Sequence, residues 1–288
     1  GMGLGADPER MALQLDELDE ATVGRLAGTH EAGIIEPGPV AGVELVAVPV
    51  PLRHDVGAVD LRHLRTGLQL GDVGAQAHRA AEVAAGPTPP AFAWAYNESL
   101  EPYPYDPDMA RDLLAEAGME APEVTFYVTE GGSGMLDPIA MGTAIQADLE
   151  AVGFDVSIET YEWNTFLGNV NPGLEGKADM AEMAWMTNDP DTLPYLALRT
   201  DAWPDAGGFN SGYYSNEEVD RLLEEARVAT DQDTRAELYK QMQEIVQEDA
   251  PWVFVANWKQ NAVTKTSVEN FKLQPSFFLM LQDVAKPQ

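Results

Sequence analysis

Residues 123–161 read EVTFYVTEGGSGMLDPIAMGTAIQADLEAVGFDVSIETY, and this stretch decides the fold class. Its two ends, 123–129 and 155–161, are rich in β-branched and aromatic residues and partly alternate apolar with polar positions, which is typical of strands. Between them, residues 137–153 begin with Asp-Pro and end with Gly, the signals that start and stop a helix. A strand, a helix and a strand within about 40 residues predict a βαβ unit, whose right-handed crossover makes the two strands parallel. The sequence therefore predicts an α/β fold.

The chain on either side continues this alternation of helices and strands. Asp-Pro at 106–107 and Gly118 bound a predicted helix. Ser215 and Glu218 have the spacing of a capping box, which predicts that the serine is the N-cap of a second helix. The other predicted elements are a buried strand within 178–186, a helix over 233–249 that ends before Pro251, and a buried strand over 252–258.

The charge of the chain restricts its partners. With 48 acidic and 17 basic side chains among 288 residues, the net charge is −31, which excludes a nucleic-acid partner because a polyanion would be repelled. This excess of acid favours a halophilic protein, kept soluble where salt screens the self-repulsion. The last 38 residues hold four of the basic and two of the acidic side chains, so residues 1–250 carry −33 and residues 251–288 carry +2. Such a shift predicts an organisational boundary near residue 251.

Several kinds of chemistry find no support in the sequence. The chain has no cysteine, and its four histidines lack the spacing of a zinc site, so we expect no metal and no cofactor. The glycine-rich loop 131–134 lacks the Lys-Ser/Thr of a P-loop. Asp137 would also occupy the helix N-terminus that a phosphate needs, so we interpret the loop as a flexible connection.

Aromatic and acidic residues gather near predicted strand ends in the second half. Trp163, Trp185 and Trp203 lie beside polar residues and prolines, where loops shape ligand clefts in α/β proteins. Asp189 and Asp191 follow Trp185 and leave open a glycoside or peptide hydrolase that uses the two carboxylates. The alternative is that neighbours two apart in a Pro-containing turn cap or solvate that turn.

Several motifs together resemble the C-terminal half of the family 5 extracytoplasmic solute-binding proteins, the peptide- and nickel-binding receptors of ABC importers. They are YDPDMARDLLAEAG (105–118), AIQADLEAVGFDVSIETYEWNTFL (144–167), GKADMAEMAWMTNDPDTLPYL (176–196), residues 211–260 and VENFKL (268–273). The resemblance implies a type II periplasmic-binding-protein-like lobe with a mixed sheet flanked by helices, plus partial segments of the other lobe.

The resemblance also implies a division of the chain. Residues 1–55 would be a partial segment of lobe I, residues 56–250 lobe II, and residues 251–288 the returning segment of lobe I. Within 52–85 the sequence departs from the family's helix-forming pattern. The resemblance implies an extracytoplasmic receptor that delivers its ligand to an ABC transporter permease, with no enzymatic step and with a membrane anchor in a segment absent from this chain.

The ligand prediction compares single positions with the family. In its dipeptide receptors, an Asp three residues after the motif Trp pairs with the ligand ammonium, and an Arg in the loop before the helix predicted at 137–153 pairs with its carboxylate. Here Asn188 and Gly132 stand at these positions. Losing both ion-pair partners disfavours a buried zwitterion, so we expect an oligopeptide, or as an alternative an oligosaccharide. The predicted ligand-binding residues are Trp185, Thr187, Asn188, Asp189, Trp163 and Gly132.

Overall fold

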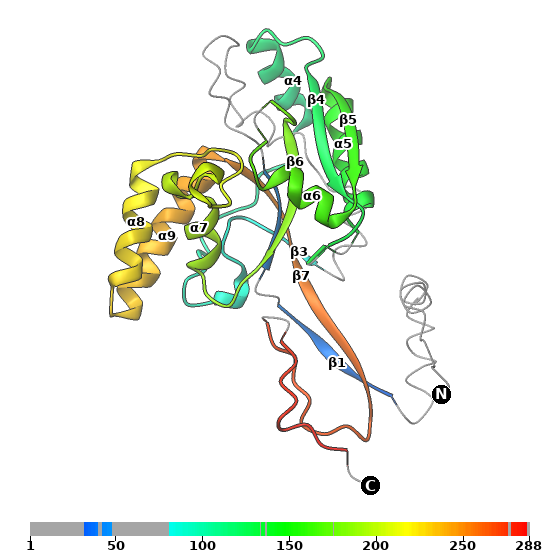
Figure 1. Ribbon diagram of the computed structural model, residues 1–288, viewed down its shortest axis with the longest axis vertical. Coiled ribbons are helices and arrows are strands. Elements are labelled where there is room, and N and C mark those ends of the chain that lie inside the picture. Colours follow the sequence, from blue (N-terminus) through cyan, green and yellow to red (C-terminus); the bar gives the residue numbers. More distant parts are fainter. Residues whose placement is uncertain are drawn as a thin grey trace. The chain divides into compact units, whose positions relative to one another are not determined.

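The computed structural model describes residues 32–39, 42–47, 81–132, 134–135, 137–174, 176–275 and 278–286. The chain divides into two compact units, one of residues 1–38 with 261–288 and one of residues 39–260 (Figure 1). Most of the predicted lobe I segment at 1–55, most of the divergent stretch at 52–85 and all four histidines lie outside the described residues.

The predicted βαβ unit is confirmed. Strand β4 (Glu123–Thr129) and strand β5 (Asp155–Tyr161) are parallel and paired in register along their whole length, with helix α5 (Pro138–Val152) between them in the chain. The carboxylate of Asp137 caps α5 by accepting the N–H of Ala140 at 3.1 Å. Gly153 ends the helix at φ 115°, a left-handed conformation that favours glycine.

The sheet is mixed, as the resemblance implies. Its strand order is β1-β7-β2-β6-β4-β5, and β3 also pairs with β7. Strand β6 (Met180–Met186) is parallel to β4 but antiparallel to β2 (Gly42–Ala47), and β2 is antiparallel to β7 (Trp252–Lys265). The remaining described strands are β1 (Ala32–Pro39) and β3 (Ala81–Val83).

Helices cover this sheet and pack against one another. The described α-helices besides α5 are α4 (Pro107–Glu116), α6 (Trp163–Val170), α7 (Thr192–Ala197), α8 (Glu217–Val228) and α9 (Gln232–Asp249). Short 3-10 helices lie at Pro90–Phe92, Thr200–Ala202 and Pro204–Ala206. In Figure 1, α8 and α9 lie side by side.

One predicted cap was wrong by one residue. The N-cap of α8 is Asn216, whose side-chain oxygen accepts the N–H groups of Glu218 and Val219, and not Ser215. Ser215 instead places its hydroxyl 3.0 Å from that of Thr200. The predicted strand at 252–258 was also too short, because β7 runs on to Lys265.

The core lies on both faces of the sheet. Phe126 of β4 packs in one cluster with Ile145 and Leu149 of α5. Its neighbour Tyr127 points to the opposite face, as successive strand residues do, and packs with Phe166 of α6. A third cluster joins α7, α8 and α9 to Trp252 and Phe254 of β7. Side chains thus pack on both faces of β4, β5 and β6, and all three strands point the same way.

Candidate ligand site at the carboxyl ends of three strands

Three neighbouring parallel strands end close to the predicted ligand-binding residues. Strands β4, β5 and β6 finish at Thr129, Tyr161 and Met186. The N–H of Glu130 donates to the carbonyl of Tyr161 at 2.8 Å, which joins the first two strand ends. In open α/β sheets, ligands bind outside the carboxyl ends of the strands. The loop at 131–134, Trp163 and the loop at 187–191 all follow these ends.

The structure brings Gly132 and Trp163 together. A Cβ built at position 132 would lie 2.3 Å from Cε3 of Trp163, so the indole lies over the glycine backbone. The same ring stacks on Phe166, with ring centroids 5.9 Å apart and planes inclined by 14°. At Gly134 a Cβ would lie 3.3 Å from Cβ of Ala184 and 3.4 Å from Cγ of Met186, so the glycine-rich loop reaches the end of β6.

Trp185 belongs to a different aromatic group. Its ring meets Phe209 edge to face, with 5.5 Å between centroids, and it packs against the cluster of α7, α8 and α9. Trp163 packs instead against the α6 cluster. Trp203 donates its indole N–H to the carbonyl of Tyr214 at 3.2 Å, a supporting contact within a loop. The sequence did not identify Phe209 as a partner because 24 residues separate it from Trp185 in the chain.

The loop after β6 is a compact polar turn. The hydroxyl of Thr187 donates to the carbonyl of Asp189 at 2.8 Å and accepts the N–H of Asp189 at 3.2 Å. The carboxylate of Asp189 then accepts the N–H of Asp191 at 2.9 Å. Thr187 is buried and so supports the turn, whereas Asn188 is exposed.

Two arginines and a tyrosine hold the carboxylates of this loop. Asp191 lies 3.5 Å from Nε of Arg227 and accepts the hydroxyl of Tyr239 at 3.3 Å. Burial raises the pKa of Asp191 above its ordinary value, although Arg227 opposes that shift. Arg235 lies 3.9 Å from Asp189. Because the two carboxylates share one turn and are already engaged, this geometry does not support a hydrolase in which they face each other across a cleft.

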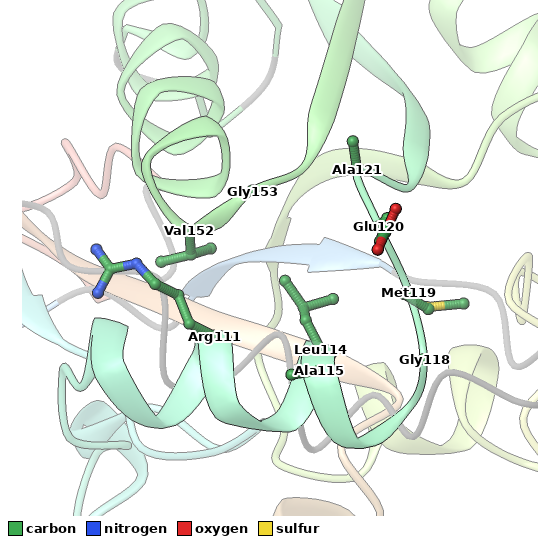
Figure 2. Close-up of a pocket in the computed structure, with 9 residues that line it drawn as sticks. All are labelled: Arg111, Leu114, Ala115, Gly118, Met119, Glu120, Ala121, Val152 and Gly153. Carbon is green, nitrogen blue, oxygen red and sulfur yellow. The ribbon is translucent and has the colours of Figure 1, made fainter.

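A separate cavity of about 370 Å³ lies at the C-terminal ends of α4 and α5. Because α5 starts after the end of β4 and finishes before the start of β5, this cavity is at the opposite edge of the sheet from the predicted site. In Figure 2, Arg111 and Glu120 lie on opposite sides of Leu114. Its lining residues are Arg111, Leu114, Ala115, Gly118, Met119, Glu120, Ala121, Val152 and Gly153.

Within the described residues, no cluster of three or more His, Asp or Glu side chains is arranged to hold a metal ion. None of the described helices is both long enough and apolar enough to cross a membrane. The candidate site contains the aromatic rings of Trp163 and Trp185, the polar loop at 187–191, and two carboxylates paired with arginines.

Comparison with solved structures defines the class of protein. The fold matches the ABC transporter-associated periplasmic binding protein DppA from Helicobacter pylori, solved in complex with peptide STSA, with a TM-score of 0.74 and 25% sequence identity. The match covers 92% of this chain and 52% of that chain. The chain thus has the fold of a type II periplasmic binding protein, and it holds part of one.

Sequence comparisons then identify the family. Residues 74–207 match the family described as bacterial extracellular solute-binding proteins, family 5 middle. The chain is 30% identical over 197 residues to di/tripeptide-binding protein 4 of Pseudomonas aeruginosa, which covers 68% of this chain and 36% of that protein. It is 35% identical over 178 residues to heme-binding protein A of Haemophilus influenzae, covering 60% and 31%. Residues 74–207 thus belong to family 5 of these solute-binding proteins, and the chain spans about a third of the length of the curated relatives it matches.

Proposed function

We propose that this chain is part of a receptor that captures an oligopeptide outside the cytoplasm and delivers it to the permease of an ABC importer. The observation that carries the proposal is the edge where β4, β5 and β6 end, because Trp163, Trp185 and the loop at 187–191 lie at or directly after these strand ends. Ligands of open α/β folds bind at such an edge. The similarity to a di/tripeptide-binding protein and to a structure holding peptide STSA supports a peptide as the ligand class.

The composition of the edge favours a peptide longer than a dipeptide. Gly132 offers no side chain and lies beneath Trp163, and Asn188 is neutral. A free dipeptide brings two opposite charges close together, and burying them without charged partners costs free energy. A longer peptide instead offers backbone amides, which the exposed carboxamide of Asn188 can bind as both donor and acceptor.

The mechanism of such a receptor is closure on the ligand. We assign residues 56–250 to lobe II and residues 1–55 and 251–288 to segments of lobe I. The ligand then contributes differential affinity for the closed form, which is the form that docks on the permease. No covalent step is part of this mechanism.

Native mass spectrometry of the purified 288-residue chain tests the ligand class. We expect a bound mass that tandem fragmentation identifies as a peptide of three or more residues. Trp185→Ala should weaken the binding of such a peptide in calorimetry, whereas Trp203→Phe, a change in a supporting contact, should leave it unchanged. A co-purified sugar, or binding of free dipeptides that is tighter than that of tetrapeptides, would contradict the proposal.

A further inference from the structure

Arg235, near the start of α9, links the proposed ligand loop to the pair of helices α8 and α9. Its Nη2 donates to the hydroxyl of Tyr239 at 3.0 Å and lies 3.9 Å from Oδ1 of Asp189, and its Nε donates to the carbonyl of Ala226 at 3.0 Å. Its guanidinium carbon lies 5.3 Å from the ring centre of Trp94. These four contacts fix the guanidinium in place beside the loop.

The charges at the loop balance. Asp189 faces Arg235, and Asp191 faces Arg227, at 3.9 Å and 3.5 Å respectively. The hydroxyl of Tyr239 lies between the pairs, since it accepts from Arg235 and donates to Asp191. Two carboxylates and two guanidiniums sum to zero, in a chain whose net charge is −31.

We propose that Arg235 determines the charge preference of the site, because it keeps the loop at 187–191 neutral toward the ligand. This inference rests on the proposed function, in which that loop lines the site. The side chain of Asp189 is 48% exposed and could otherwise attract a ligand ammonium. The nearby guanidinium cancels much of its field. The receptor therefore binds a peptide whether or not its N-terminus is charged.

Calorimetry with two matched probes tests this on the full 288-residue chain. The probes are tetra-alanine amide with a free amino group and the same peptide N-acetylated. The unaltered chain should bind both within about twofold of each other. Arg235→Gln should prefer the free amine by about fivefold, as expected when a partly exposed ion pair is opened. Adding Asp189→Asn should return the ratio to its original value, and an unchanged ratio in Arg235→Gln would overturn the proposal.

Arg221→Gln is the matched control. Arg221 also pairs with two carboxylates, those of Glu218 and Glu225, but within α8 itself. This variant changes the net charge of the chain by the same amount, so it should leave the ratio of the two affinities unaltered. If it shifts the ratio as much as Arg235→Gln does, the effect is one of net charge and the proposal is wrong.

A second probe separates this inference from the proposed function. If the unaltered chain binds neither peptide, the peptide-receptor proposal fails, and tetramethylammonium then serves as a simple cation. Amide NMR shifts of Asn188 and Asp189 should report binding that is about fivefold tighter in Arg235→Gln than in the unaltered chain or in Arg221→Gln. Equal affinities in all three chains would reject the role of Arg235.

Discussion

The indole of Trp163 covers the backbone of Gly132 so closely that no side chain fits between them. A Cβ at position 132 would lie 2.3 Å from Cε3 and 2.6 Å from Cζ3 of the ring. The ring is also held from within the protein, because it stacks on the fully buried Phe166. The indole can therefore occupy this place only if residue 132 is a glycine. The ring gives the proposed site an aromatic surface where β4 and β5 end.

Gly132→Ala should displace the indole of Trp163 and destabilise the protein by about 1–3 kcal/mol, the usual cost of overpacking. Urea unfolding measures this cost. Gly131→Ala is the matched control, since a Cβ at position 131 meets no atom within 4 Å, and it should change stability by less than about 0.5 kcal/mol. In a Trp163→Ala background the cost of Gly132→Ala should vanish, and a cost that persists there would exclude the ring as its cause.

Asn216→Ala should destabilise the protein by about 1 kcal/mol, because it removes the side-chain oxygen that accepts two N–H groups at the start of α8. The substitution also removes the hydrogen bond from Asn216 to Asp249. Ser215→Ala tests the alternative cap and should cost less. Thermal unfolding of both variants compares them directly, and a larger cost at Ser215 would mean that the capping box operates in solution.

The same pair of residues indicates how far the fold can be predicted from the sequence. The bounds of β4 and β5 agree with prediction because runs of β-formers, an Asp-Pro cap and a terminal Gly are all local signals. At α8 the local capping box was misleading, because a tertiary contact with Thr200 engages Ser215 while Asn216 reaches Asp249. Local patterns cannot include such distant partners.

The candidate site could likewise be predicted from the sequence only in part. Trp163 and Gly132 could be selected because each follows a predicted strand, and the parallel order of β4 and β5 then brings them together. The partners of the carboxylates in the loop at 187–191 could not be identified from the sequence, since Tyr239 lies 48 residues beyond Asp191. Arg235 and Tyr239 have the i, i+4 spacing of one helix face, but nothing local indicates that this face meets the loop.

Asp191→Asn should alter how stability depends on pH. Burial raises the pKa of Asp191 in the folded protein above its ordinary value of 3.8, so the folded state binds this proton more tightly than the unfolded chain does. The free energy of unfolding should therefore fall as the pH rises from 3.8 through the folded pKa. Substitution by asparagine removes this contribution and should make the profile flatter over that range.

Asp205→Asn is the control for the pH experiment, because Asp205 is exposed and its substitution removes the same charge. Chemical denaturation at several pH values gives the profiles of both variants and of the unaltered chain. If the free energy of unfolding falls more steeply with rising pH in Asp191→Asn than in the unaltered chain, the sign expected from burial is wrong. If Asp205→Asn flattens the dependence of the unfolding free energy on pH as much as Asp191→Asn does, the effect arises from overall charge.

Salt should stabilise the whole chain, because its net charge of −31 produces self-repulsion that ions screen. We expect the Tm to rise by several degrees as NaCl increases from about 0.1 M to about 2 M. Sucrose at equal osmolality is the control, since it favours compact states without screening charge. If sucrose raises the Tm as much as NaCl does, the stabilisation does not arise from screening and the halophilic interpretation loses its support.

The single substitutions Glu116→Gln and Glu150→Gln test whether part of this repulsion arises at the C-terminal ends of two helices. Both glutamates are exposed, in the last turns of α4 and α5, and neither of these turns contains a basic residue of its own to balance the negative end of the helix dipole. At the end of α5, Arg111 of α4 donates to the carbonyl of Ala151 at 3.4 Å, so we expect the smaller gain there. Each substitution should stabilise the protein by about 0.3–1 kcal/mol at low salt and by less at high salt. Asp108→Asn should have the opposite effect and destabilise the protein. Asp108 lies in the first turn of α4 and pairs with Arg111, so its carboxylate is favourable there. Urea unfolding at two salt concentrations measures all three changes, and a stabilising effect of Asp108→Asn would show that net charge outweighs position along the helix.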